Sequence, residues 1–259
     1  MNLMREQDQY RCVPGTADVL EHFTTRAERY NRSSNWCCDQ ELASVIWNVT
    51  RPLPQQRVLD VACGTGLVSR IFHGRVARVV GVDITPAMFH QARQHLDELV
   101  VAPAERLPLP DADFDVVVSR QGIQFMDDKA AVREMVRVLK PGGRVCLIQL
   151  CAYGEADKRE YFEVLRLRNP ARKNFYVRGD LQRMLVDAGC REVTVHDYVS
   201  AEDVDAWADN GAIGESDREA IRDVYRHASS AFRQLHAVEL GDSGRIIDRM
   251  LFGVALGVK

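Results

Sequence analysis

The amino-acid sequence predicts an α/β fold in which helices flank a mostly parallel sheet of seven strands. Three observations lead to this fold class. An apolar strand pattern runs into a turn of small residues and then into a helical pattern over residues 57–72. Apolar runs alternate with amphipathic helical stretches up to about residue 150. A chain of 259 residues can also bury one large core, so we expect a single domain over residues 1–259.

The first strand and turn read RVLDVACGTG at residues 57–66. Residues 58–62 are typical of a strand buried on both faces, and the small residues after them permit a tight turn. A helix is expected to follow, with its free N–H groups directed back at the turn. Such a unit binds nucleotide-like ligands by close approach to the backbone. The apolar residues that share one face of this helix are Leu67, Val68, Ile71 and Phe72.

The residues around the turn narrow the choice of ligand. Ser69 stands where a dinucleotide-binding fingerprint has its third glycine, and the carboxylate of Asp60 would repel a phosphate. An acid beside an N–H-rich turn suits a ligand that carries an ammonium, a carboxylate and a cationic centre. S-adenosylmethionine (SAM) is such a ligand. Asp83 ends the second strand, residues 77–83, and is placed to accept hydrogen bonds from ribose hydroxyls of NAD or SAM equally.

The remaining elements follow in order. Strands are predicted at residues 99–102, 116–119, 144–150, 192–198 and 250–258. Helices are predicted at residues 86–96, 128–139, 157–168, 180–188, 202–208 and 217–240. Two more helices precede the first strand, whereas residues 1–15 are polar and are interpreted as a tail or lid. The helices between the last two strands form an insertion at the active edge of the sheet, a usual place for substrate recognition.

Four sequence blocks stand in the same order as in a known family. They are VLDVACGTG, VVGVDIT, AERLPLPDADFDVVVSRQGIQF and REMVRVLKPGGRV, beginning at residues 58, 79, 104 and 133. Together they resemble class I SAM-dependent methyltransferases of the ubiquinone/menaquinone-biosynthesis-like type, strongly from about Tyr30 to Leu150 and more loosely beyond. The resemblance implies a Rossmann-like sheet, SAM as cofactor, S-adenosylhomocysteine as product and a small organic acceptor.

The resemblance also implies how the chain is divided and where the ligands bind. Residues 1–50 would form an N-terminal helical lid, residues 51–151 the SAM-binding core, and residues 152–259 the substrate-cap helices and C-terminal strands. The family usually has an Asp for the adenine amino group where this chain has Pro103, which leaves the backbone N–H of Ala104 for the ring. The expected cofactor-binding residues are Tyr30, Asp60, Ala62, Gly64, Gly66, Asp83, Ile84, Ala104, Glu105, Ser119 and Gln121. The candidate acceptor-binding residues are Trp36, Gln124, Tyr153 and Tyr176.

Methyl transfer from a sulfonium is an in-line displacement, so the protein chiefly has to align the reactants and exclude water. A general base is optional, and none is assigned. His196, His227 and His236 are candidates, but lone histidines at such positions are more often surface or core residues. There is no metal-ligand spacing and no metal is expected. The adjacent pair Cys37 and Cys38 suggests methylation of a thiol or metalloid as an alternative.

Composition and charge bear on partners and location. The formal net charge of −3, with basic residues spread among acidic ones, argues against a nucleic-acid partner. The chain has no apolar run long enough for a membrane span and no signal peptide, so a cytoplasmic protein, monomeric or homodimeric, is expected. An NAD-binding oxidoreductase and a non-catalytic SAM-binding partner protein both remain open as functions of this chain.

Overall fold

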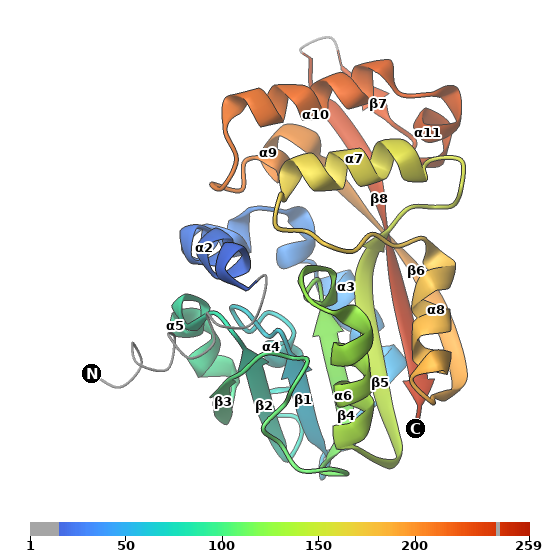
Figure 1. The fold of residues 1–259 in the computed structure, drawn as a ribbon. Helices are drawn as coiled ribbons and strands as arrows, with labels where there is room; N and C mark the ends of the chain where they lie inside the picture. Colours follow the sequence, from blue (N-terminus) through green and yellow to red (C-terminus); the bar gives the residue numbers. More distant parts are fainter. Residues whose placement is uncertain (1–15, 242–243) are drawn as a thin grey trace.

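A computed structural model describes residues 16–241 and 244–259 of the chain (Figure 1). The predicted tail at residues 1–15 lies outside the described residues. The centre of the molecule is one mixed sheet with the strand order β3-β2-β1-β4-β5-β8-β6, in which β7 pairs with β8. The strands are β1 (Arg57–Val61), β2 (Arg78–Asp83), β3 (Glu98–Val101), β4 (Phe114–Arg120), β5 (Leu139–Cys151), β6 (Arg191–Asp203), β7 (Glu239–Leu240) and β8 (Ile246–Val258).

The pairing directions confirm a mostly parallel sheet. The neighbours β1 to β5 are all parallel, while β8 runs antiparallel to both β5 and β6. The seven predicted strands are all present, and the two-residue β7 adds an eighth by pairing with the start of β8. Since parallel strands end at the same edge, the residues that follow β1, β2 and β4 are brought together there.

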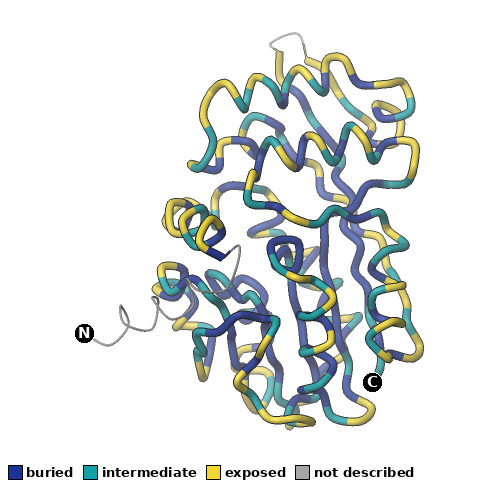
Figure 2. Tube along the Cα trace, viewed as in Figure 1, coloured by how far each residue is buried: buried dark blue, intermediate teal, exposed yellow. Residues whose placement is uncertain are grey.

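Helices cover both faces of this sheet. α3 (Gln40–Thr50), α4 (Ser69–Phe72) and α5 (Phe89–Ala92) contribute to the core on one face, and α6 (Asp128–Val138) and α8 (Arg178–Asp187) to the core on the other. The apolar strand patterns of the sequence account for this arrangement, since β1 and β4 are almost wholly buried between the two helical layers (Figure 2).

The remaining helices lie beyond the carboxyl ends of the central strands (Figure 1). They are α7 (Lys158–Arg168), α9 (Val204–Ala208), α10 (Glu215–His227) and α11 (Ser230–Leu235), and α10 contacts both α7 and α9. We call these four helices the cap. The N-terminal α2 (Ala17–Arg26) lies between the cap and the sheet edge, followed by the 3₁₀ turns η1 (Tyr30–Arg32) and η2 (Asn35–Cys37). None of the described helices is long and apolar enough to cross a membrane.

Two predicted helices differ from those observed. Residues 86–96 form the turns η3 (Pro86–Met88) and η4 (Arg93–His95) around the short α5 instead of one helix. The pattern of buried residues is preserved, because short helical turns bury the same positions. The predicted helix at residues 217–240 is split, since Ala228 adopts an extended ψ of 147° and the Ser229 hydroxyl accepts the N–H of Phe232 as a new N-cap.

Candidate active site

The turn after β1 has a left-handed backbone at three positions. Ala62, Gly64 and Gly66 all have positive φ angles, of 57°, 52° and 79°. The turn is closed by a hydrogen bond from Gly66 N to Cys63 O (2.9 Å) and is joined to β2 by one from Cys63 N to Val82 O (3.0 Å). Gly122 is required on the facing loop, because a Cβ there would lie 2.4 Å from the Cβ of Ala62.

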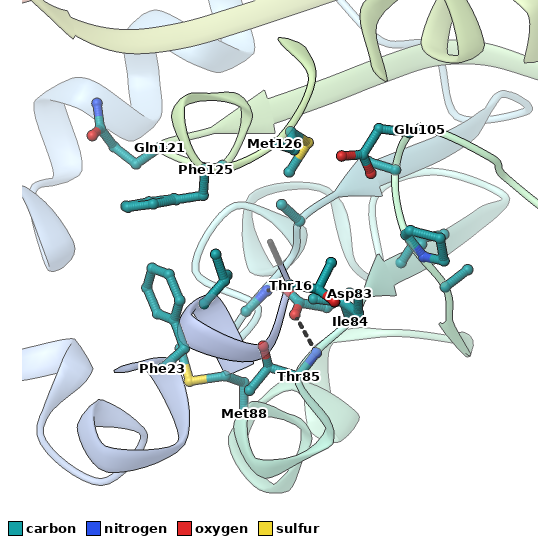
Figure 3. A pocket seen from close by; sticks show the side chains of 18 of the residues that line it. Thr16, Phe23, Asp83, Ile84, Thr85, Met88, Glu105, Gln121, Phe125 and Met126 are labelled. Atoms are coloured by element: carbon teal, nitrogen blue, oxygen red, sulfur yellow. Dashed lines mark hydrogen bonds between the residues drawn. The ribbon is translucent and has the colours of Figure 1, made fainter. Parts of the chain in front are cut away.

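Asp83 ties the end of β2 to this turn. Its Oδ2 accepts the N–H of Gly64 at 2.8 Å. Its Oδ1 accepts the N–H of Thr85 at 2.8 Å (Figure 3). Burial raises the pKa of the Asp83 carboxyl, whereas the two backbone N–H groups favour its ionised form. The side chain therefore holds the turn in place and also lines the adjacent cavity.

A cavity of about 690 Å³, part of it open to solvent, lies over the turn. Figure 3 shows Asp83 and Thr85 at one side and Gln121, Phe125 and Phe23 at another. Eight of the eleven residues expected to bind cofactor line it, namely Tyr30, Ala62, Gly64, Asp83, Ile84, Ala104, Glu105 and Gln121. Pro103, which stands in place of the family's usual acid, also lines it.

The other three expected cofactor residues are not among those that line the cavity. Asp60 lies buried beneath the turn, where its Oδ2 accepts the Ser69 hydroxyl at 2.6 Å and burial raises its pKa to about 7. Gly66 allows the turn to pack on α5, since a Cβ there would lie 3.0 Å from Ala92 Cα. Ser119 is fully buried in β4, and its hydroxyl has no partner in the described part of the chain.

A second cavity of about 370 Å³ adjoins the first and lies toward the cap. The two cavities share Phe23, Tyr30, Gln121 and Phe125. Of the expected acceptor residues, Trp36 and Gln124 line the second cavity. The Gln124 amide also donates to Gln121 Oε1 at 3.1 Å, so the two glutamines lie together at this boundary.

Tyr153 and Tyr176, the other two acceptor candidates, are not among the residues that line either cavity. The Tyr153 hydroxyl donates to Arg249 O at 2.8 Å, and the Tyr176 hydroxyl donates to Asp128 Oδ2 at 3.0 Å. Each hydroxyl already has a partner elsewhere in the fold, so neither is free to contact a molecule in the second cavity.

The three candidate histidines also lie away from the cavities. His196 is exposed on β6, and exposed His227 contacts Asp223 O through Nδ1 at 3.0 Å. His236 is fully buried, with Nδ1 2.8 Å from Asp248 and Nε2 3.0 Å from Asp157. Burial by itself would lower its pKa, but the two carboxylates outweigh this and raise it to about 9. His236 therefore joins the cap to the sheet.

Cys37 is buried and Cys38 is exposed, so the adjacent pair does not form one two-sulfur surface. Burial raises the pKa of the Cys37 thiol to about 11, which disfavours the thiolate that a metalloid would need. Within residues 16–241 and 244–259, no group of three or more His, Cys, Asp or Glu side chains is placed to hold a metal ion.

Sequence reasoning missed three arginines that line the second cavity, namely Arg26, Arg168 and Arg172. A pattern in the sequence marks two of them. Arg26 continues the helical stripe of Val19 and Phe23, and Arg168 continues that of Tyr161 and Leu165. A charged residue on the apolar face of a helix becomes buried with that face. Charged side chains are rarely buried unless they are paired with another group.

Comparisons with known proteins agree with this geometry. A family model described as a methyltransferase domain matches residues 59–147. The uncharacterized methyltransferase YcgJ of Bacillus subtilis is 27% identical over 247 residues, covering 92% of this chain and 97% of that protein. The ubiquinone/menaquinone biosynthesis C-methyltransferase UbiE of Ectopseudomonas mendocina is 33% identical over 174 residues, covering 55% of this chain and 68% of that protein.

The crystal structure of YcgJ superposes with a TM-score of 0.78 at 24% identity, covering 85% of this chain and 99% of that one. This likeness supports the fold, and the sequence relatives support the family. The chain therefore belongs to the class I SAM-dependent methyltransferases. It is an enzyme of that class, with SAM as its cofactor.

Proposed function

We propose that the protein transfers the methyl group of SAM to an O, N or C nucleophile of a small organic acceptor. The observation that carries this proposal is the pair of adjoining cavities that share Phe23, Tyr30, Gln121 and Phe125. A cofactor in the larger cavity and an acceptor in the smaller one would meet at these four side chains. In-line displacement requires such an end-to-end arrangement.

The residues of the larger cavity fit SAM by their chemistry. The carboxylate of Asp83 suits the ribose hydroxyls, and the apolar side chains of Ile84, Met88 and Ala102 suit the flat adenine. Gly64 suits the turn because its φ of +52° is a backbone conformation that side chains strain. Asp60, Gly66 and Ser119 would support the turn from below instead of touching the cofactor.

Bound SAM supplies an electrophilic methyl group on a sulfonium. The chain's own residues orient the acceptor and keep water out. Tyr30, Trp36 and Trp207 provide aromatic walls to the second cavity, and Gln121 and Gln124 provide neutral hydrogen-bonding groups at its boundary. No histidine of the described chain is among the residues that line either cavity, and no general base is assigned.

The cap supports an acceptor of metabolite size. Leu165, Arg168 and Trp207 come from α7 and α9 and line the second cavity, so these helices form part of its wall. A concave site of this kind, partly open to solvent, suits a molecule of metabolite size. We infer one domain with an N-terminal lid and a C-terminal cap, acting in the cytoplasm as a monomer or homodimer. The six described cysteines are all free, as is usual in a reducing compartment.

Isothermal titration with SAM, S-adenosylhomocysteine and NADH tests the cofactor part of this proposal. We expect micromolar binding of the first two and none of NADH. Mass spectrometry of a metabolite extract after incubation with SAM then tests turnover. A protein that binds SAM yet methylates nothing in the extract would be a non-catalytic SAM-binding partner, and the proposed catalysis would be withdrawn.

A further inference from the structure

The second cavity concentrates positive charge in the interior. Arg26, Arg168 and Arg172 are 2%, 6% and 8% exposed, and all three line it. Among the described residues that line this cavity there is no Asp or Glu. The three come from different places, since Arg26 ends α2, Arg168 ends α7 and Arg172 lies in the loop that follows α7. The fold therefore brings three cations together from separate segments.

Their hydrogen bonds go to neutral groups. Arg168 donates from Nε to Trp207 O at 2.8 Å, and Arg172 donates from Nε to Asn174 O at 2.9 Å. Arg26 Nη1 lies 3.3 Å from His22 Nε2, whose pKa is lowered to about 4 by burial and by nearby arginines. Within the described chain, Arg26 Nε and Arg172 Nη2 have no hydrogen-bond partner.

The carboxylate of Glu202, which acts electrostatically on Arg168, already has other hydrogen-bond partners. Glu202 interacts with it electrostatically, but the Glu202 carboxylate accepts the backbone N–H groups of Asn35 and Trp36 and the Ser200 hydroxyl. No ion pair is formed by any of the three arginines among residues 16–241 and 244–259. Burial lowers the pKa of Arg168 to about 9 and that of Arg172 to about 10.

Buried cations that have no counter-charge destabilise a fold, and several near one another do so more. Such an arrangement persists where a ligand supplies the missing charge. A planar guanidinium binds a carboxylate or a phosphate group through paired N–H donors, which is why arginine is preferred for these groups. The aromatic walls of Tyr30, Trp36 and Trp207 suit an apolar or aromatic body attached to such an anion.

We propose that the acceptor carries an anionic group, a carboxylate or a phosphate, that is bound by Arg26, Arg168 and Arg172. This inference rests on the proposed function, because it assigns the second cavity to the acceptor. The anion anchors the far end of the molecule. The nucleophile then lies at the boundary formed by Tyr30 and Gln121.

Three probes of similar shape and different charge test the proposal, namely phenylacetate, phenyl phosphate and the neutral phenylacetamide. Each is titrated calorimetrically into the full-length protein saturated with S-adenosylhomocysteine. We expect the two anions to bind at least about tenfold more tightly than the amide, since charge-assisted hydrogen bonds are roughly twice as strong as neutral ones.

Variants connect that preference to the arginines. Arg26→Gln and Arg172→Gln should reduce anion affinity to the level of the amide, and Arg172→Lys should retain part of the preference. Arg159→Gln is the matched control, because Arg159 lies on the exposed side of α7 and lines neither cavity. Arg168 is not used, since its bond to Trp207 O also holds the cap. Arg172→Gln and Arg172→Lys both lose the bond from Nε to Asn174 O, so a difference in anion affinity between these two variants reports the charge and not that bond.

The outcomes separate this proposal from the function on which it rests. If the parent protein does not bind S-adenosylhomocysteine, the proposed function itself is overturned. If that ligand binds but the three probes bind equally, or none binds at millimolar concentration, the anion site alone is overturned. Equal anion affinity in the Arg159→Gln and Arg172→Gln variants would have the same consequence.

Discussion

The carboxylate of Asp83 at the end of β2 accepts the backbone N–H of Gly64 at 2.8 Å, across the gap between two neighbouring strands. The acid that lines the larger cavity therefore also holds the glycine turn in its left-handed conformation. Cofactor binding and the shape of the turn depend on the same side chain.

Replacement of Asp83 is the first prediction. Asp83→Ala should weaken SAM binding by about one to three orders of magnitude, because hydrogen bonds to a charged group contribute about 1.5–3 kcal/mol each. Isothermal titration measures this directly. Asp97→Ala is the control, since Asp97 accepts the N–H of Val79 at 2.7 Å in a similar way but lines neither cavity. Equal SAM affinity of the two variants would place the ribose elsewhere.

Replacement of Gly66 by alanine should destabilise the fold more than the same replacement of Gly74, a glycine outside the turn. Gly66 and Gly74 have similar φ angles of 79° and 73°, but only at Gly66 would a Cβ meet another residue, Ala92 Cα at 3.0 Å. Gly74→Ala should lose about 1 kcal/mol of stability from backbone strain alone, and Gly66→Ala clearly more. Urea denaturation tests the difference in stability.

Gly64→Ala should instead weaken SAM binding, which isothermal titration measures. A Gly64→Ala variant with unchanged SAM affinity would contradict the placement of the cofactor over the turn.

Asp60 should make stability depend on pH. Its pKa is raised from 3.8 to about 7 in the folded protein, chiefly by burial, so the unfolded chain loses this proton first. Between these pH values the unfolded state therefore binds fewer protons, and stability falls as pH rises. Asp60→Asn should gain stability relative to the parent by up to about 4 kcal/mol over this range. Denaturation at several pH values measures it, with exposed Asp18→Asn as control. A pH-independent difference would refute the assignment.

His236 should also make stability fall as pH rises, but over a higher pH range. Because its pKa is raised from 6.5 to about 9, its contribution is complete below pH 6.5 and is lost as pH rises through 9. His236→Gln should therefore destabilise the protein by a few kcal/mol near pH 6 and by much less near pH 9. Thermal melts at both pH values compare it with exposed His227→Gln. A constant deficit would mean that the two carboxylates do not hold a charged imidazole.

The sequence predicted the sheet well because its strands are apolar runs buried on both faces, as β1 and β4 show. Eight of the residues expected to bind the cofactor line one cavity, since strand ends converge there; their contact with a cofactor stays a prediction. Periodicity could not show that the Asp60 carboxyl accepts the Ser69 hydroxyl or that Gly66 packs on Ala92, because both contacts depend on the path of the chain between β1 and the helices after it. It could not show that Tyr153 contacts Arg249 or that Arg26 and Arg172 line one cavity, because these arrangements join distant segments.

Methyl transfer from SAM to a small molecule held under the cap can be measured directly. The most direct measurement incubates the protein with SAM labelled in its methyl group and a cell extract divided by size into metabolites and macromolecules. We predict that label enters a compound of the metabolite fraction, and that Asp83→Ala strongly reduces this transfer at limiting SAM. Label that enters only protein or nucleic acid, or transfer by Asp83→Ala that equals that of the parent protein at limiting SAM, would contradict this prediction.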